Sequence, residues 1–218
     1  MNLDDVKRLV AQGEGLTIEF KRKVPQAERI AKELIALANT EGGHVFFGVD
    51  DDGTITGVKD AVEEEYALLE AINQRCVPPL SFELERVFVK GRRDVLVLFI
   101  PKSPKRPHYL VHEDGQRVAY LRVDEMSVEA SKEAIRIMKA ERDPTDTSFR
   151  FGDNELKLMR YLDAYGRITV DQYADLAGIP RKVASQTLVL MVRARVLDFH
   201  ANDRQDFFTT AVAGTSAS

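Results

Sequence analysis

Three carboxylates in the first quarter of the chain are the residues best suited to chemistry: Glu14, Glu19 and Asp51. Hard divalent cations such as Mg²⁺ and Mn²⁺ take oxygen ligands, commonly two or three carboxylates completed by water. A cation held in this way can activate water and stabilise a phosphoryl transition state. On one continuous strand, Glu14 and Glu19 would face opposite sides, because they are five residues apart. They can share a site only if the chain bends near Gly13 and Gly15.

A purely structural interpretation explains the same three residues. Glu14 would then be exposed, Glu19 would pair with a lysine, and Asp51 would belong to a turn. Other catalytic sets are missing from the sequence. It contains no G-x-x-x-x-G-K-[ST] phosphate loop and no G-x-S-x-G motif, and its four histidines do not form a metal-binding pattern. The choice is therefore between a carboxylate site and a site that binds without catalysis.

Basic residues follow the second carboxylate directly, in the run Lys21-Arg22-Lys23. Arg92-Arg93 forms a second basic patch, and Lys102, Lys105 and Arg106 form a third. Each patch alone is also explained by a solvated turn. The formal net charge of the chain is −4, so nucleic-acid binding would have to come from such local patches.

Composition indicates a soluble globular protein of 218 residues, with 44% hydrophobic and 30% charged residues. The longest apolar run, residues 95–100, is too short to span a bilayer. The N-terminus is acidic and has no apolar signal region. Cys76 is the single cysteine, which fits a reducing compartment. We therefore expect a cytoplasmic protein.

The first part of the chain mixes short helices with hairpin strands. Leu16, Ile18 and Phe20 alternate with polar residues, which predicts a half-buried strand. Helices are predicted at 4–10, 61–73 and 130–140. A further helix can begin at Pro25, has helical apolar spacing over 30–38 and is stopped by Gly42-Gly43. A buried strand at 44–49 and a hairpin formed by 82–89 and 94–100 complete the pattern, with shorter strands near 109–111 and 118–123. Hairpins in place of regular βαβ units predict an α+β fold.

Four segments can be assigned from these patterns. Residues 1–141 form the α+β domain, 142–152 a polar linker, and 213–218 a disordered tail. Residues 153–212 contain three predicted helices and then a strand pair around Asn202-Asp203. That order is typical of a winged helix-turn-helix domain.

The second domain offers its own candidates for contact with DNA. A recognition helix places its early residues in the major groove, and the loop between the strands can reach the backbone. The residues that would do so are Arg181, Lys182, Ser185, Gln186 and, at the tip of the wing, Arg204. Winged helices also serve as protein-docking or dimerisation modules, so this interpretation stays open beside the first.

Several motifs together resemble the Schlafen-type AlbA-like domain, once described as a divergent AAA domain. They are Glu14, Glu19-Phe20-Lys21, Ala38-Asn39-Thr40-Glu41-Gly42-Gly43, Gly48-Val49-Asp50-Asp51-Asp52-Gly53, Gly57, Arg106-Pro107-His108-Tyr109 and Tyr120-Leu121-Arg122-Val123. The resemblance covers roughly residues 1–141. One departure comes after Val123, where many members continue with Gly-Ser and this chain has Asp124-Glu125.

The resemblance implies a mixed sheet-and-helix fold and a nucleic-acid partner. Family members with nuclease activity cut transfer RNA or other RNA with three carboxylates, which match Glu14, Glu19 and Asp51 here. That activity would need Mg²⁺ or Mn²⁺, and Lys21 would contact a phosphate beside the site. Many bacterial relatives carry the same pattern and are regarded as nucleic-acid-binding regulators.

We therefore expect a nucleic-acid-binding protein that acts as a DNA-binding transcriptional regulator, with Lys21, Arg22 and Lys23 among its binding residues. A cofactor, Mg²⁺ or Mn²⁺, is expected only for a nuclease. The alternative is a metal-dependent endoribonuclease that cuts structured RNA. A third hypothesis is an interaction protein whose winged helix forms a homo-oligomer. No membrane partner is expected.

Overall fold

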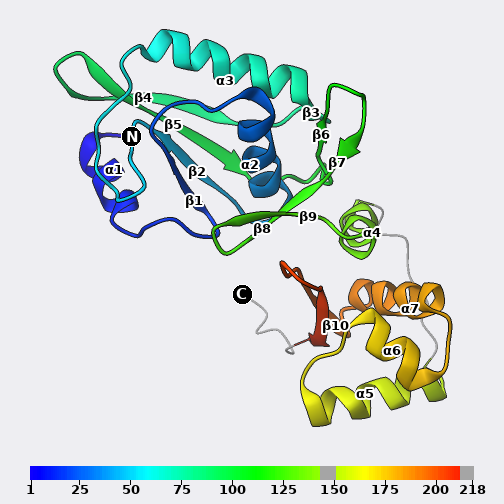
Figure 1. Cartoon of the computed structure of the whole chain (residues 1–218). Coiled ribbons are helices and arrows are strands. Elements are labelled where there is room, and N and C mark those ends of the chain that lie inside the picture. The colour runs from blue at the N-terminus through cyan, green and yellow to red at the C-terminus, as the bar shows by residue number, and fades with distance from the viewer. Residues whose placement is uncertain (143–150, 212–218) are drawn as a thin grey trace. The chain divides into compact units, whose positions relative to one another are not determined.

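The computed structural model describes residues 1–142 and 151–211 (Figure 1). The chain divides into two compact units, Met1–Glu129 and Ala130–Ser218. Each unit has buried apolar clusters of its own among the described residues.

The first unit contains three helices and nine strands among its residues. In chain order they are α1 (Leu3–Val10), β1 (Ile18–Lys21), α2 (Ala27–Asn39), β2 (Gly42–Phe47), α3 (Ala61–Arg75), β3 (Cys76–Val77), β4 (Glu83–Lys90), β5 (Arg93–Pro101), β6 (Tyr109–Val111), β7 (Arg117–Val118), β8 (Tyr120–Val123) and β9 (Met126–Glu129). This mixed arrangement confirms the predicted α+β class.

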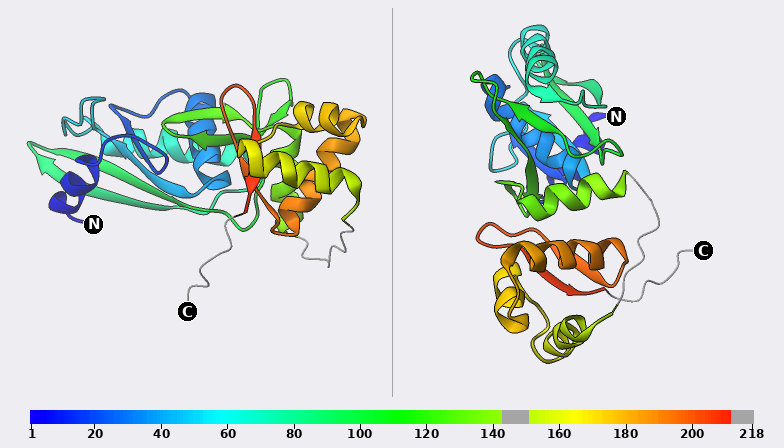
Figure 2. Two further views of the ribbon diagram at one scale, coloured as in Figure 1. Left: turned by 90° about the horizontal axis from the view of Figure 1, so that it is seen from below. Right: turned by 90° about the vertical axis from the view of Figure 1, so that its right-hand side faces the viewer.

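The central sheet of the first unit has the strand order β1-β2-β5-β4. β1 and β2 are parallel, whereas β5 is antiparallel to both β2 and β4. The last residues of β1, β2 and β4 therefore lie at the same end of the sheet as the first residues of β5. We call this end the carboxyl end of the central sheet. The turn of the long β4–β5 hairpin projects from it (Figures 1 and 2).

Helices cover both faces of this sheet, so its inner strands are apolar on both sides. On one face Val45, Phe47 and Leu96 pack with α2 and α3. On the other face Phe46 and Val97 pack with α1. The alternation of strand side chains explains why neighbouring residues enter different clusters.

Asn39, at the end of α2, ties two later segments to that helix. Its side-chain amide donates to the carbonyl oxygens of His108 (3.0 Å) and Tyr120 (2.9 Å), and its Oδ1 accepts from the His108 N–H at 2.7 Å. Thr40 Oγ1 accepts from the Arg122 N–H at 2.8 Å. The Ala-Asn-Thr motif therefore fixes the position of the strands around β6 and β8.

The described part of the second unit consists of four helices and one hairpin. They are α4 (Lys132–Glu141), α5 (Asp153–Tyr165), α6 (Val170–Ala177), α7 (Arg181–Arg193), β10 (Leu197–His200) and β11 (Phe207–Thr210). Leu158, Tyr173, Leu188 and Phe208 belong to one core that joins the last three helices to the hairpin. The elements occur in the predicted order, and the identification of the unit as a winged helix-turn-helix stays a prediction.

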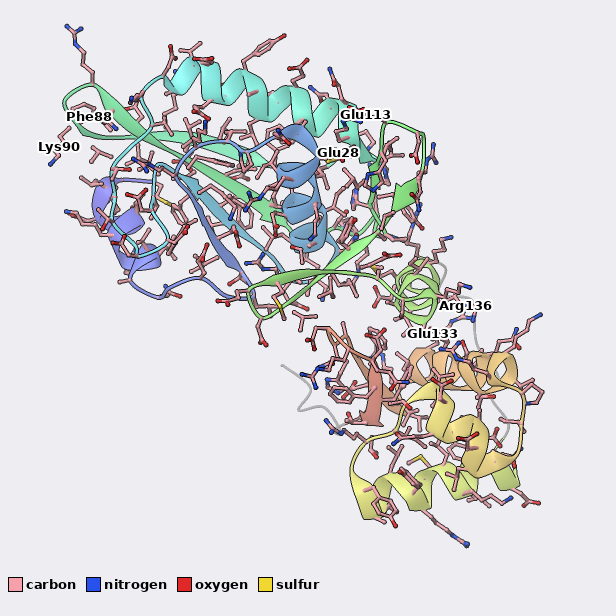
Figure 3. All side chains as sticks on the ribbon, in the orientation of Figure 1. Glu28, Phe88, Lys90, Glu113, Glu133 and Arg136 are labelled. Carbon is pink, nitrogen blue, oxygen red and sulfur yellow. The ribbon has the colours of Figure 1, made fainter. Side chains whose placement is uncertain are left out.

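α4 belongs to the second unit, although the sequence placed it in a first domain ending at residue 141. Its Ile137 enters the core of the second unit. Glu133 accepts a hydrogen bond from the Ser185 hydroxyl at 2.5 Å, and Arg136 Nη1 donates to Ser185 Oγ at 2.9 Å; both side chains are labelled in Figure 3. The boundary therefore falls before Ala130 because this amphipathic helix packs on α7.

Parts of two predicted segments fall outside the described residues. Residues 143–150 make up most of the predicted linker, and 213–218 were predicted as the tail. Within the ranges 1–142 and 151–211, no helix combines the length and apolar character needed to cross a membrane.

Candidate nucleic-acid interface

The chain bends between α1 and β1, as a shared site for Glu14 and Glu19 requires. Gly13 has φ +80°, a conformation that side-chain-bearing residues rarely adopt. The Gly15 N–H donates to the Ile18 carbonyl at 3.0 Å, and Glu14 Oε1 accepts from the Phe20 N–H at 2.8 Å. The bend thus brings Glu14 back alongside β1.

Glu19 is held by two cationic side chains. It is only 6% exposed, its Oε1 pairs with Lys21 Nζ, and its Oε2 pairs with Arg122 Nη2. Arg122 of β8 is itself buried and pairs with Glu33 of α2 at 3.0 Å. It also donates from Nε and Nη2 to the Gly15 carbonyl, both at 3.1 Å. This network joins α2, β1, β8 and the bend before β1.

Asp51 is exposed in the turn after β2, where the Gly53 N–H donates to the Asp50 carbonyl at 2.8 Å. Asp51 and Glu14 line one hollow of about 540 Å³, which we call the acidic hollow. Asp52, Glu125 and Lys7 also line it. Burial raises the pKa of Glu14; the Phe20 N–H and Lys21 oppose the shift, and the charges of Glu19 and Asp51 add to it. Two of the three predicted carboxylates therefore share a surface.

The three carboxylates do not fit a divalent cation as they are arranged. Both oxygens of Glu19 are bonded to cationic groups, and Glu14 Oε1 is bonded to a backbone N–H. Among residues 1–142 and 151–211, no group of three or more His, Cys, Asp or Glu side chains could hold a metal ion. Oxygens of Glu14 and Glu19 that would bind a cation are thus already engaged by groups of the protein.

A second, larger hollow of about 1,140 Å³ opens at the carboxyl end of the central sheet, and we call it the basic groove. One acidic side chain, Glu64, lines it, and its Oε2 accepts from the Val24 N–H at 2.6 Å. Five basic side chains line it: Arg22, Lys23, Lys59, Lys90 and Arg93.

The sheet topology brings these five side chains together. Arg22 and Lys23 come directly after β1, Lys59 lies in the segment after β2, and Lys90 and Arg93 flank the β4–β5 turn. All of these positions lie at the carboxyl end of the central sheet. Charges that are far apart in sequence thus line one surface.

Two glycines let the segment after β2 lie close to the strands. A Cβ on Gly48, which has φ +99°, would lie 2.7 Å from the Gly57 Cα. A Cβ on Gly57 would lie 2.8 Å from the Arg93 Cβ. The Gly57 N–H donates to the Gly48 carbonyl at 2.8 Å. Both positions need glycine because there is no space for a side chain.

Most of the positive charge in the basic groove is available to a ligand. Lys23, Lys59 and Lys90 are exposed and have no ion-pair partner in the part of the chain that the structure describes. Arg22 Nε lies 3.5 Å from Asp50 Oδ1. Arg93 Nη1 donates to the Gly57 carbonyl at 3.1 Å. The groove therefore presents a local positive field on a chain of negative net charge.

Lys21 is placed differently from its two neighbours. Its Nζ pairs with Glu19 and donates to the Phe20 carbonyl at 2.9 Å. It is half-buried and does not line the basic groove. Arg22 and Lys23 do line the groove, which leaves them as candidates for phosphate contact there. The expected contact of Lys21 with a phosphate beside the carboxylates stays a prediction.

The predicted DNA-contacting residues of the second unit are in three different situations. Ser185 is 2% exposed and bonded to Glu133, so the expectation that it reaches nucleic acid is wrong. Arg181 is exposed, but its Nε donates to Asp171 Oδ1 at 2.7 Å. The other three are exposed: Lys182, Gln186 and Arg204.

Sequence reasoning missed Lys59 and Lys90 as binding candidates and treated Arg93 only as part of a separate patch. Lys59 and Lys90 are each a single charge near a strand end, which has no distinctive local pattern. The useful signal was the strand order, because the parallel strands β1 and β2 direct the residues after them to the same side as the β4–β5 turn.

The chain belongs to the Schlafen, AlbA_2 family, which matches residues 14–131. Membership indicates a nucleic-acid-binding role. The match ends close to the boundary between the two units, so it describes the first unit and not the second.

Two solved structures are similar to parts of the chain. One is the N-terminal domain of an ATP-dependent DNA helicase RecG-related protein from Nitrosomonas europaea, with 22% identity over 58% of this chain and 92% of that one, and a TM-score of 0.43. The other is the DIP2311 protein from Corynebacterium diphtheriae, with 17% identity over 77% of this chain and 35% of that one, and a TM-score of 0.41. No curated protein matches this chain significantly.

The buried pair of Arg122 and Glu19 generates a stability prediction. Replacing Arg122 by methionine should lower the free energy of unfolding by about 3–5 kcal/mol, because a buried carboxylate loses its partner. Urea unfolding measures the loss. In Arg122→Met combined with Glu19→Gln, the total loss should be smaller than the sum of the two single losses. Additive losses would contradict the pairing.

Proposed function

We propose that this chain binds nucleic acid through the basic groove of its first unit. The observation that carries the proposal is the convergence of five basic side chains from separate loops on one hollow. Lysine and arginine neutralise backbone phosphates and release counterions, which gives affinity without requiring a particular base sequence. In this proposal the basic groove is the surface of the first unit that contacts the phosphates of the nucleic acid.

The neighbouring acidic hollow supports a defined path for the bound strand. Ile55 lines both hollows, so the acidic one begins where the basic groove ends. Asp51, Asp52 and Glu125 would repel phosphates there, while Lys59 and Lys90 attract them on the other side. The phosphate backbone would therefore run along the groove and avoid the site of the three predicted carboxylates.

The finer proposal is a DNA-binding transcriptional regulator. In it the second unit acts as a winged helix-turn-helix and α7 reads base edges. Lys182 and Gln186 support this assignment, because both are exposed in the first two turns of α7. Arg204, exposed between β10 and β11, would contact the backbone. The basic groove would add affinity that does not depend on sequence.

Cleavage of structured RNA is the second candidate function, and the three carboxylates would carry it out. Glu14 and Asp51 favour it, because they share a hollow next to the basic groove. Glu19 disfavours it, because a ligand set would have to free this side chain from Arg122 and Lys21. We therefore assign binding, and not cleavage, to the first unit.

The basic groove predicts a reduced salt dependence when its lysines are removed. In the variant Lys23→Ala with Lys59→Ala and Lys90→Ala, the slope of log K against log salt on duplex DNA should fall by about 0.9 for each phosphate that is no longer neutralised. Fluorescence anisotropy at several salt concentrations measures the slope.

Lys105→Ala provides the matched control, because Lys105 is an exposed lysine that lies beyond the opposite end of β5. Its slope should equal that of the unchanged protein. A triple variant with an unchanged slope would show that nucleic acid does not enter the groove.

The recognition role of α7 predicts a loss of sequence discrimination. Replacing Lys182 and Gln186 by alanine should reduce the preference for a selected duplex over random duplex by about 1–3 kcal/mol for each base that is no longer read. Competition binding with the two duplexes measures it, and Lys157→Ala on α5 is the control. Intact discrimination, together with a dimer seen by light scattering, would favour the dimerisation hypothesis for the second unit.

A further inference from the structure

Phe88 is an aromatic side chain on β4 that the fold leaves uncovered. It is 63% exposed, although it lies on a strand of the central sheet. Its neighbours Val87 and Val89 pack in the cluster on the α1 side. Because strand side chains alternate, Phe88 faces the other side of the sheet, where α2 and α3 lie.

Along that face, the side chains of β4 become more exposed towards the hairpin turn. Leu84 packs against the cluster of α2 and α3. Arg86 Nε donates to Glu65 Oε2 of α3 at 2.7 Å. Phe88 is next in the row and lies past this contact, close to the turn that projects from the unit (Figure 3). It is therefore presented to solvent at the end of the sheet where the basic groove opens.

A bulge separates Phe88 from the nearest charge of the basic groove. Phe88 pairs with Asp94 and Lys90 pairs with Arg93, so the register shifts between Phe88 and Lys90. Such a bulge re-aims the side chains beyond it. Lys90 and Arg93 both line the groove, so Phe88 is two residues along β4 from one of its cations and one register step from the other.

We propose that Phe88 stacks on an unpaired base of a single-stranded nucleic acid whose phosphates lie in the basic groove. This inference rests on the proposed function and specifies the form of its ligand. Basic grooves flanked by exposed aromatic rings bind single strands, because every base has a face that can stack. The bases of an intact duplex already stack on one another and do not offer that face.

An isolated exposed apolar residue is common on protein surfaces and needs no function. Tyr66 provides the comparison within the same unit, because it is 69% exposed on α3. It lies two residues after Glu64, which lines the groove, so it points to a different side of the helix. Tyr66 should contribute nothing to binding, whereas Phe88 should.

The test uses the full chain and three probes that separate bases from phosphates. They are a single-stranded DNA of about 12 nucleotides, the same strand with abasic positions, and a duplex of equal length. Fluorescence anisotropy gives the affinity for each. Phe88→Leu keeps an apolar side chain without an aromatic ring, Phe88→Tyr keeps a ring, and Tyr66→Ala is the control.

Phe88→Leu should weaken binding of the single strand about tenfold, and leave binding of the abasic strand and of the duplex unchanged. Phe88→Tyr and Tyr66→Ala should bind like the unchanged protein. Equal affinity of Phe88→Leu for the single strand, with salt-dependent binding of all three probes intact, would overturn the stacking role and leave the proposed function standing. Absence of salt-dependent binding by the unchanged protein would overturn the proposed function and the stacking role together.

Discussion

The parallel pairing of β1 with β2 is the constraint on which the arrangement of the first unit depends. It directs the residues after both strands to one end of the central sheet, and the antiparallel β5 and β4 bring their turn to the same end. Gly48 and Gly57 then allow the segment after β2 to lie against the strands. The basic groove results from this topology, because no single segment carries enough positive charge to form it.

The buried Arg122 network links this scaffold to the residues that were candidates for catalysis. Arg122 pairs with Glu19 and Glu33 and donates to the Gly15 carbonyl, so it fixes the bend that positions Glu14. The charge of Glu19 balances a buried guanidinium, a role that competes with binding a cation. In this chain the carboxylate motif therefore helps to hold the first unit together.

Local patterns predicted much of the fold and less of the site. Helical spacing and terminal glycines located α2, and apolar runs located β2 and the β4–β5 hairpin, because these signals lie within each segment. The need for a bend before β1 was also visible from the spacing of Glu14 and Glu19. The partner of Glu19 and the convergence on the basic groove depend on contacts across the sheet. Ser185 failed as a candidate because α4 covers it, which a helical pattern cannot reveal.

The central claim is that nucleic acid binds in the basic groove. Hydrogen exchange of the full chain with and without bound nucleic acid tests it most directly. Backbone amides of the segments that line the basic groove become shielded from solvent when a strand occupies it, whereas those of distant segments do not. If nucleic acid occupies the basic groove, residues 54–59 and 88–93 should exchange more slowly on binding. Slower exchange confined to residues 181–204, with both groove segments unchanged, would contradict it.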